Sequence, residues 1–246
     1  MKKGDNMENI YLKVPRLIHC FGNEKNIVSI NMVIEMLESS KNNIVPINTH
    51  NIDNVEEWDL LPIGYGDANW RELSERMDTT NYIPVWNINL QNSAEEVIRR
   101  TLKAVEMGGK RAVKLEVLDS NHKWSINDEV VKVTKKLMEQ DLEIWPLIAP
   151  EKETIDELLD LKCPMIRILG SEISSGNGIS DKTINAMKYI KSKSNTKVML
   201  DGGVGKAGDV YKALIEGFDS VLVNSYLFKE HSPSEELDKI VNVKVK

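Results

Sequence analysis

Strand-like and helix-like segments alternate eight times along this chain, and this alternation most constrains its fold. Apolar runs of four to eight residues predict strands at 16–21, 44–47, 82–87, 111–118, 142–148, 164–169, 197–201 and 219–224. Helical periodicity predicts helices at 25–39, 70–77, 93–107, 126–139, 152–160, 180–192 and 206–216, with a last short helix at 234–241. Such alternation is typical of parallel βαβ units.

Eight units in 246 residues favour an α/β fold of the single (β/α)₈ TIM-barrel type over an open doubly wound sheet. The first strand is not followed by a Gly-x-Gly-x-x-Gly turn, which argues against a dinucleotide-binding fold. No Pro-, Gly- or Ser-rich linker divides the chain. We therefore expect one barrel domain over residues 1–246, with residues 1–10 loose.

Composition narrows the classes of partner. The chain has 32 basic and 38 acidic residues, a net charge of −6 and no basic block, so we expect neither nucleic-acid nor membrane-surface binding. No apolar run approaches the roughly 18 residues of a membrane span, and the N-terminus has no signal-peptide core. Two distant cysteines and four scattered histidines match no metal-ligand spacing. These features predict a cytoplasmic, reduced protein without a metal or a cofactor.

The strand at 111–118 carries two charged residues where an apolar run is expected. Side chains alternate along a strand, so Val113, Leu115 and Val117 share one face. Lys114 and Glu116 then share the other, inner face, where ionisable groups are costly unless they pair or do chemistry. Burial disfavours the charged amine, and a neutral lysine forms Schiff bases with carbonyls. A Lys114–Glu116 salt bridge, or a lysine reaching the barrel mouth, is the structural alternative, and Lys114→Met is expected to be tolerated.

Asp201 strengthens the chemical interpretation of Lys114. It ends the strand at 197–201, where alternation with Met199 points its carboxylate into the barrel. Active sites of such barrels lie at the C-terminal ends of the strands. One amine and two carboxylates there suffice for imine formation and proton transfer. Asp201 could instead cap the helix at 206–216.

Two glycine-rich or polar segments close the neighbouring strands and suggest an anion site. Gly202, Gly203 and Gly205 leave the backbone bare before the helix at 206–216, where N–H groups attract phosphate. Asn224 and Ser225 are expected to add donors after the last strand. The alternative is a tight turn that binds nothing. The loop at 170–178, which contains Ser174, is either a lid or a connector.

Five segments, in this order and spacing, resemble the thiazole synthase family of thiamin biosynthesis. They are Ser93-Ala-Glu-Glu-Val97, Val113-Lys-Leu-Glu-Val117, Gly170-Ser-x-Ile-x-Ser-Gly-x-Gly-Ile179, Asp201-Gly-Gly-Val-Gly205 and Val221-Leu-Val-Asn224. The resemblance begins at Arg16 and is strongest from Ser93 to Ser225.

The resemblance implies a (β/α)₈ barrel, often a homotetramer, and a transferase. Its reaction joins 1-deoxy-D-xylulose 5-phosphate, a glycine-derived imine (dehydroglycine) and sulfur from a small carrier protein with a C-terminal thiocarboxylate. Lys114 matches the Schiff-base lysine, and Glu116 and Asp201 match the acid/base carboxylates. Substrate and sugar-phosphate positions of the family fall on Ser174, Gly202, Gly203, Asn224 and Ser225.

The chain departs from the family pattern around the barrel mouth. Ser174 stands where the family has glycine, and Glu172 where it has proline. Paired arginines after the second strand are replaced by Asn48-Thr-His50, and the segment after the third strand is Asn87-Ile-Asn-Leu-Gln91. Two alternatives therefore stay open: a diverged Schiff-base enzyme for another keto-sugar phosphate, and a barrel that binds a ligand or partner without turnover.

Overall fold

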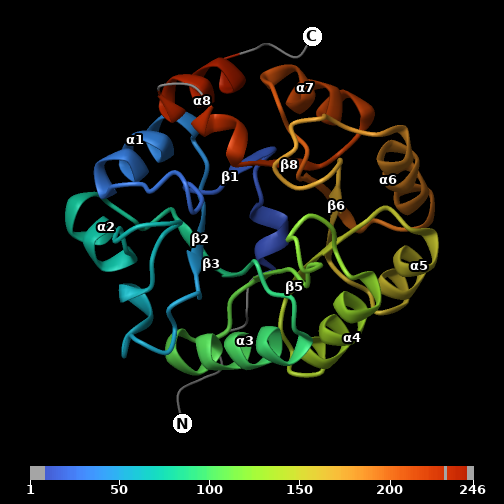
Figure 1. Ribbon diagram of the computed structural model, residues 1–246, viewed down its shortest axis with the longest axis horizontal. Coiled ribbons are helices and arrows are strands. Elements are labelled where there is room, and N and C mark those ends of the chain that lie inside the picture. Colours follow the sequence, from blue (N-terminus) through green and yellow to red (C-terminus); the bar gives the residue numbers. More distant parts are fainter. Residues whose placement is uncertain (1–8, 230–231, 243–246) are drawn as a thin grey trace.

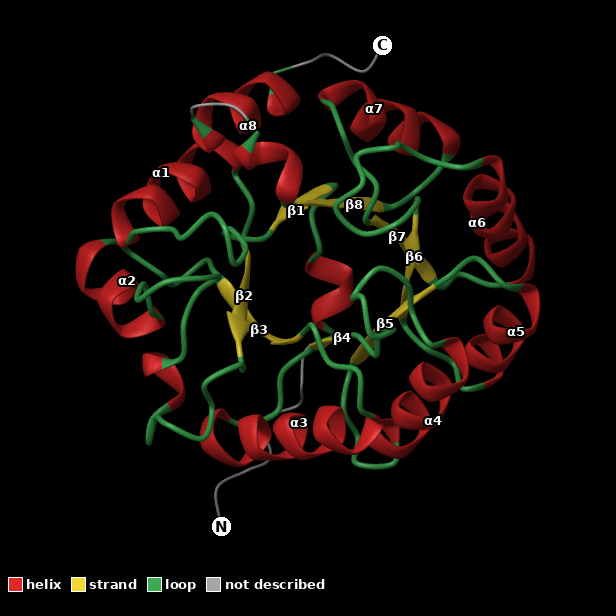
Figure 2. Cartoon of the chain, viewed as in Figure 1, coloured by secondary structure: helices red, strands yellow, loops and turns green. Residues whose placement is uncertain are grey.

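The chain forms a single ring of parallel strands surrounded by helices (Figures 1 and 2), as seen in a computed structural model that describes residues 9–229 and 232–242. The eight strands hydrogen-bond in the order β1-β8-β7-β6-β5-β4-β3-β2. Every ladder is parallel. The predicted (β/α)₈ barrel is confirmed.

The observed elements follow the predicted ranges closely. The strands are β1 (Leu17–His19), β2 (Ile44–Asn48), β3 (Ile83–Ile88), β4 (Val113–Leu115), β5 (Ile144–Ile148), β6 (Met165–Leu169), β7 (Lys197–Asp201) and β8 (Ser220–Val223). The α-helices are α1 (Ile30–Ser40), α2 (Trp70–Arg76), α3 (Ala94–Gly108), α4 (Asn127–Met138), α5 (Lys152–Asp160), α6 (Asp181–Lys193), α7 (Ala207–Glu216) and α8 (Pro233–Val241). Short 3₁₀ helices are η1 (Ile10–Lys13), η2 (Trp58–Leu60) and η3 (Ser225–Phe228).

Serine caps decide where several helices begin. Ser29 accepts a hydrogen bond from the N–H of Met32, so α1 starts at Ile30, five residues after the predicted start at 25. Ser93 caps α3 in the same way, at 3.4 Å from the N–H of Glu96. The Glu96 carboxylate bonds Arg99 and Arg100, in place of the Ser93 N–H that a full capping box requires.

Pro46 explains why the hydrogen-bonded ring is interrupted between β1 and β2. The N–H of Asn48 points away from β3 and donates to the carbonyl of Pro62. The nitrogen of Pro46, two residues earlier, faces the same side and carries no hydrogen. β2 is therefore an edge strand toward β1, which is where a strand tolerates proline.

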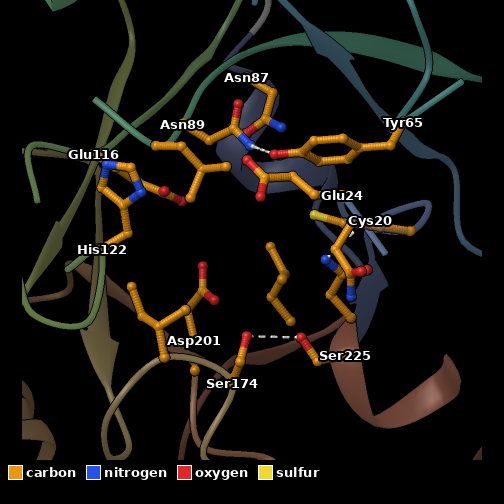
Figure 3. Close-up of a pocket in the computed structure, with 18 of the residues that line it drawn as sticks. Cys20, Glu24, Tyr65, Asn87, Asn89, Glu116, His122, Ser174, Asp201 and Ser225 are labelled. Atoms are coloured by element: carbon orange, nitrogen blue, oxygen red, sulfur yellow. Dashed lines mark hydrogen bonds between the residues drawn. The ribbon is translucent and has the colours of Figure 1, made fainter. Parts of the chain in front are cut away.

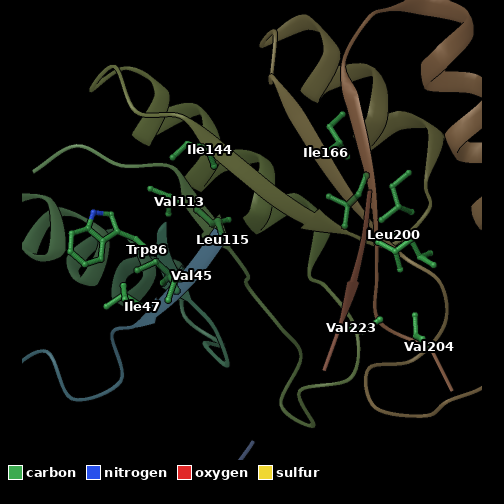
Figure 4. Packing of buried hydrophobic residues seen from close by; sticks show 14 of the residues in the cluster. Val45, Ile47, Trp86, Val113, Leu115, Ile144, Ile166, Leu200, Val204 and Val223 are labelled. Atoms are coloured by element: carbon green, nitrogen blue, oxygen red, sulfur yellow. The ribbon is translucent and has the colours of Figure 1, made fainter. Parts of the chain in front are cut away.

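Strand alternation separates two buried layers. Val113, Leu115 and Val117 pack in the core between the strands and the helices, as predicted (Figure 4). The barrel interior holds a second apolar cluster that includes Val85, Trp145 and Met199. This cluster fills the barrel interior below the cavity at the C-terminal mouth.

The N-terminal segment closes the other end of the barrel. η1 lies at the centre of the ring in Figures 1 and 2, and the N–H groups of Ile10 and Tyr11 donate to the Glu143 carboxylate at 2.9 and 2.7 Å. The prediction of a loose segment at 1–10 is thus wrong at Ile10, because Glu143 anchors it. Residues 1–8 lie outside the described part.

No helix within the described residues is both long enough and apolar enough to cross a lipid bilayer.

Candidate active site

All eight residues predicted to form the site line one cavity of about 790 Å³ at the C-terminal ends of the strands (Figure 3). They are Lys114, Glu116, Ser174, Asp201, Gly202, Gly203, Asn224 and Ser225. Parallel strands place their C-terminal ends at one rim, which is why residues more than 100 positions apart in sequence meet here. Their placement agrees with the sequence, whereas their chemical roles stay predictions.

Lys114 and Glu116 form an ion pair on the inner face of β4. The Nζ of Lys114 donates to Oε1 of Glu116 at 2.6 Å. Both residues are buried, with exposed fractions of 5% and 7%, yet both contribute to the cavity wall. The salt bridge and the cavity position, posed as alternatives from the sequence, are found together.

Arg167 on β6 is the central residue that our sequence reasoning missed. Its side chain is fully buried, and its Nη2 donates to Oε1 of Glu116 at 2.8 Å and to Oδ2 of Asp201 at 2.6 Å. Its Nε donates to the same Asp201 oxygen at 2.8 Å. A lone arginine inside the apolar run 164–169 was the available signal, since alternation places it on the inner face.

Charged neighbours shift the pKa values of Glu116 and Arg167. Burial alone raises the pKa of Glu116, but the charges and hydrogen bonds of Lys114 and Arg167 outweigh it and lower the pKa to about 2. Burial opposes the charge of Arg167, yet Asp201 and Glu116 raise its pKa above the usual value. At neutral pH Glu116 is therefore an anion.

Cys20 follows β1 and lies near the same charged groups. Its thiol is protonated at neutral pH. Burial is the main cause that raises its pKa, to about 11, and Asp201 and Glu116 add to the effect. Its side chain lines the cavity at 9% exposure. Because the thiolate is the nucleophilic form, Cys20 is unreactive at neutral pH.

Asp201 does not cap α7. Its carboxylate is taken by Arg167, whereas Oδ2 of Asp209 accepts from the N–H groups of Gly205 and Lys206 at 2.9 and 3.2 Å. The helix N-terminus predicted as a bare anion site is thus occupied by its own carboxylate. Among the described residues, the N–H groups of Gly203 and Val204 remain without a hydrogen-bond partner and border the cavity.

The loop at 170–178 lies against this turn. A side chain at Gly203, where φ is +80°, would place its Cβ 2.7 Å from the carbonyl oxygen of Gly178. Ser174 adopts φ +62°, a left-handed backbone that explains the glycine of the family at this position. Its Oγ lies 2.9 Å from that of Ser225 (Figure 3), so the two loops meet beside Gly203.

Asn224 differs from the prediction in what it offers a ligand. Its Nδ2 already donates to the carbonyl of Gly22 at 2.8 Å. Its Oδ1 is buried and has no hydrogen-bond partner. The Asn224 side chain therefore contributes to the cavity wall, but its Oδ1 is buried away from a ligand.

Two lysines beside the glycine turn were also missed. Lys229 follows η3, lines the cavity and lies so close to Gly176 that a Cβ there would be 2.7 Å from its Nζ. Lys123 pairs with Glu172 at 3.2 Å and thereby joins two rim loops. No periodicity marks either residue, because both sit in loops that only the fold brings together.

Side-chain amides line the far wall, where the chain departs from the family pattern. The Nδ2 of Asn87 donates to Oδ1 of Asn48 at 2.8 Å, and Oδ1 of Asn87 is buried without a partner. Asn89 donates to the Tyr65 hydroxyl at 3.5 Å. In Figure 3 these groups lie across the cavity from Ser174 and Ser225. In the part of the chain that the structure describes, no cluster of three or more His, Cys, Asp or Glu side chains could hold a metal.

Comparisons with known proteins agree on one family. A family model described as thiazole biosynthesis protein ThiG matches residues 25–237. The thiazole synthase of Geotalea uraniireducens is 30% identical over 164 residues, which make up 66% of this chain and 62% of that protein. The thiazole synthase of Geobacter sulfurreducens is 32% identical over 162 residues, 65% of this chain and 62% of that protein. The matched region therefore covers less than two thirds of each relative.

Solved structures share the fold. A chain of the Amycolatopsis orientalis BexX/CysO complex superposes with a TM-score of 0.78 at 18% identity, covering 92% of this chain and 86% of that chain. The tryptophan synthase alpha chain of Legionella pneumophila gives a TM-score of 0.58 at 12% identity, covering 94% and 90%. These identities support the barrel fold alone. The family model, which matches most of the chain, decides the question: the chain belongs to the thiazole synthase (ThiG) family.

Proposed function

We propose that this protein is a transferase of thiamin thiazole biosynthesis that acts through a Schiff base on Lys114. The substrate is 1-deoxy-D-xylulose 5-phosphate, and the product is a thiazole phosphate that takes its sulfur from the thiocarboxylate of a carrier protein. One observation carries the proposal. A buried lysine lies on the cavity wall and is bonded to a carboxylate, and the same cavity is bordered by Gly203 and Val204, whose N–H groups have no hydrogen-bond partner among the described residues.

The chemistry of Lys114 requires that its ammonium lose a proton before the nitrogen attacks the ketone. Glu116, at 2.6 Å, is positioned to accept that proton. The carbinolamine then loses its oxygen as water, and the nitrogen–carbon double bond of the imine forms. Asp201, the second carboxylate on the cavity wall, is the group we assign to proton transfer at the substrate carbons.

The phosphate belongs at the turn after β7. The N–H groups of Gly203 and Val204 supply donors, and the ammonium of Lys229 supplies charge at the same side of the cavity. In the proposed binding mode, the ketone carbon of the sugar lies toward Lys114.

The partner is part of the same proposal. The family resemblance implies a small carrier protein whose C-terminal tail enters the barrel mouth. BexX, which shares this fold, has been solved in a complex with CysO. We propose that a carrier tail enters over the amide wall at Asn87 and Asn89, opposite the phosphate side, and that the protein assembles as a homotetramer, which light scattering checks.

Borohydride trapping tests the Schiff base. The protein is incubated with 1-deoxy-D-xylulose 5-phosphate, reduced, and measured by intact and peptide mass spectrometry. We expect one adduct, located on Lys114 and lost in Lys114→Ala. The matched control is Lys110→Ala, because Lys110 lies four residues away on the surface, paired with Asp141, and should not affect the adduct.

The outcomes separate the rival functions. An adduct that survives Lys114→Ala, or no adduct at all, overturns the proposal and leaves a ligand- or partner-binding barrel. An adduct that yields no thiazole phosphate with dehydroglycine and a carrier thiocarboxylate points instead to an enzyme for another keto-sugar phosphate. For the phosphate site, we expect Lys229→Met to raise the substrate concentration that gives half-maximal trapping by about tenfold. This is the effect of losing one charge-assisted contact.

A further inference from the structure

We infer that Arg167 is a positioning residue, which holds one oxygen of Glu116 and one oxygen of Asp201 inside the barrel wall and so turns the other oxygen of each toward the substrate. The inference rests on the proposed function only for the role of the two carboxylates in proton transfer. The geometry stands without it.

The hydrogen bonds around Arg167 are selective. Its guanidinium reaches Oε1 of Glu116 and Oδ2 of Asp201, and Lys114 shares the same Glu116 oxygen. Among the described residues, no hydrogen bond reaches Oε2 of Glu116 or Oδ1 of Asp201. Because both carboxylates line the cavity, these two oxygens are the ones available to a substrate.

Arg167 is itself fixed in place. Its Nη1 donates to the backbone carbonyls of Leu115 and Trp145, each at 3.2 Å. Its contacts therefore tie β4, β5 and β7 to β6 through one planar group. It does not line the cavity, so it acts on the substrate through Glu116 and Asp201 and not by contact.

The charge balance gives Arg167 a second effect. Two cations, Lys114 and Arg167, face two anions, Glu116 and Asp201, and all four side chains are largely buried. Nearby inward residues, among them Cys20, Asn87, Trp145 and Met199, are uncharged at neutral pH.

More distant charges surround this group of four. Glu143 closes the opposite end of the barrel, and Glu24, Lys25, His122, Lys123 and Lys229 stand on the rim. Without Arg167, two carboxylates would share one lysine, and the pair would bind a proton at a higher pH. Arg167 therefore also determines the acid limit of the reaction.

The experiment compares Arg167→Met, Arg167→Lys and wild type by two readouts. The first is the pH profile of borohydride-trapped adduct formation. We expect its acid limb to move up by at least about one pH unit in Arg167→Met and by less in Arg167→Lys, which keeps the charge but not the planar fork. Arg76→Met is the control, because Arg76 is an exposed arginine on α2 and should leave the profile unchanged.

The second readout needs no substrate. The melting temperature is measured from pH 7.5 to pH 5 for each variant. In Arg167→Met the carboxylate pair has a raised folded-state pKa, so protonation stabilises the fold at low pH and this stabilisation is lost as the pH rises. The gap in melting temperature between wild type and variant should therefore narrow by roughly 3 °C or more on acidification. An arginine that does not lower the proton affinity of the two carboxylates leaves a constant gap in melting temperature.

The two readouts distinguish failure of the inference from failure of the proposed function. A constant gap together with superposed adduct profiles overturns the positioning role. If the wild type forms no adduct, the proposed function fails, and the gap alone decides on Arg167. If Arg167→Met does not fold at pH 7.5, the double variant Arg167→Met/Asp201→Asn, which keeps the Lys114–Glu116 pair and leaves no excess charge, is expected to fold, and its failure to do so overturns the inference.

Discussion

Glu116 is bonded on one oxygen by two cations, and this changes what a substitution at Lys114 does. From the sequence, Lys114→Met exchanges a buried amine for an apolar side chain of similar volume and should be tolerated. In the structure, the exchange leaves Glu116 and Asp201 with Arg167 as their only close cation, so one negative charge is uncompensated in the interior. Because Asp201 and Arg167 belong to the same group of charges, we no longer expect Lys114→Met to be tolerated.

We predict that Lys114→Met lowers the free energy of unfolding at pH 7 by about 2 kcal/mol or more, because a buried charge loses its partner. The double variant Lys114→Met/Glu116→Gln removes the excess charge and should recover most of this loss. Urea unfolding of the wild type, the single and the double variant measures both values. A single variant as stable as the wild type would show that water in the cavity compensates the charge.

At the scale of elements, the turn between β7 and α7 is shaped by backbone and not by its charges. Asp209 satisfies the first N–H groups of α7, and Gly203 at φ +80° brings the turn against the loop at 170–178. The N–H of Gly178 donates to the carbonyl of Gly203 at 2.7 Å, which joins the two loops. This packing fixes the conformation of the turn, whose residues Gly203 and Val204 border the cavity.

We predict that Gly203→Ala destabilises the protein by about 2 kcal/mol or more, since the left-handed backbone alone costs roughly 1–2 kcal/mol and the Cβ meets backbone atoms. Gly208→Ala is the matched control. Gly208 lies within α7, where the nearest atom to an added Cβ is Cε of Lys206 at 3.9 Å.

Alanine in that helical position should stabilise by about 0.5–1 kcal/mol. Chemical denaturation of the two variants gives the comparison. Equal effects of the two substitutions would contradict the conformational requirement at Gly203.

For the molecule as a whole, we propose that the barrel is one cooperative domain. η1 and Glu143 close its N-terminal end, and the helices cover its outer face. His19 on β1 is buried in that outer layer, where its Nε2 lies 2.8 Å from the Oγ of Ser40. Burial is the main cause that lowers its pKa to about 4.

We predict a single thermal transition whose midpoint falls as the pH is lowered from 7 to 4. The folded-state pKa of His19 lies below its unfolded value of 6.5, so the unfolded chain binds the proton and stability is lost through this window. The contribution of His19 is on the order of 3 kcal/mol. His50, whose pKa burial also lowers, acts in the same direction.

Calorimetry of wild type and His19→Gln checks this, because glutamine cannot titrate and should give a flatter dependence. A second transition would contradict the single domain, and identical pH profiles would contradict the role of His19.

Local periodicity determined the barrel and the face to which each strand residue points. It also brought Lys114, Glu116 and Asp201 to one rim, because parallel strands all end on the same side. The same rule predicts that Arg167 points inward, but it does not predict that Arg167 bonds Glu116 and Asp201. Which groups pair across the interior depends on the register between strands that are not neighbours in sequence.

Only the tertiary structure therefore decided that Arg167 ties the carboxylates together. It also decided that Glu143 anchors Ile10. These contacts join segments up to 133 residues apart, and hydrogen-bond geometry, not sequence pattern, selects them.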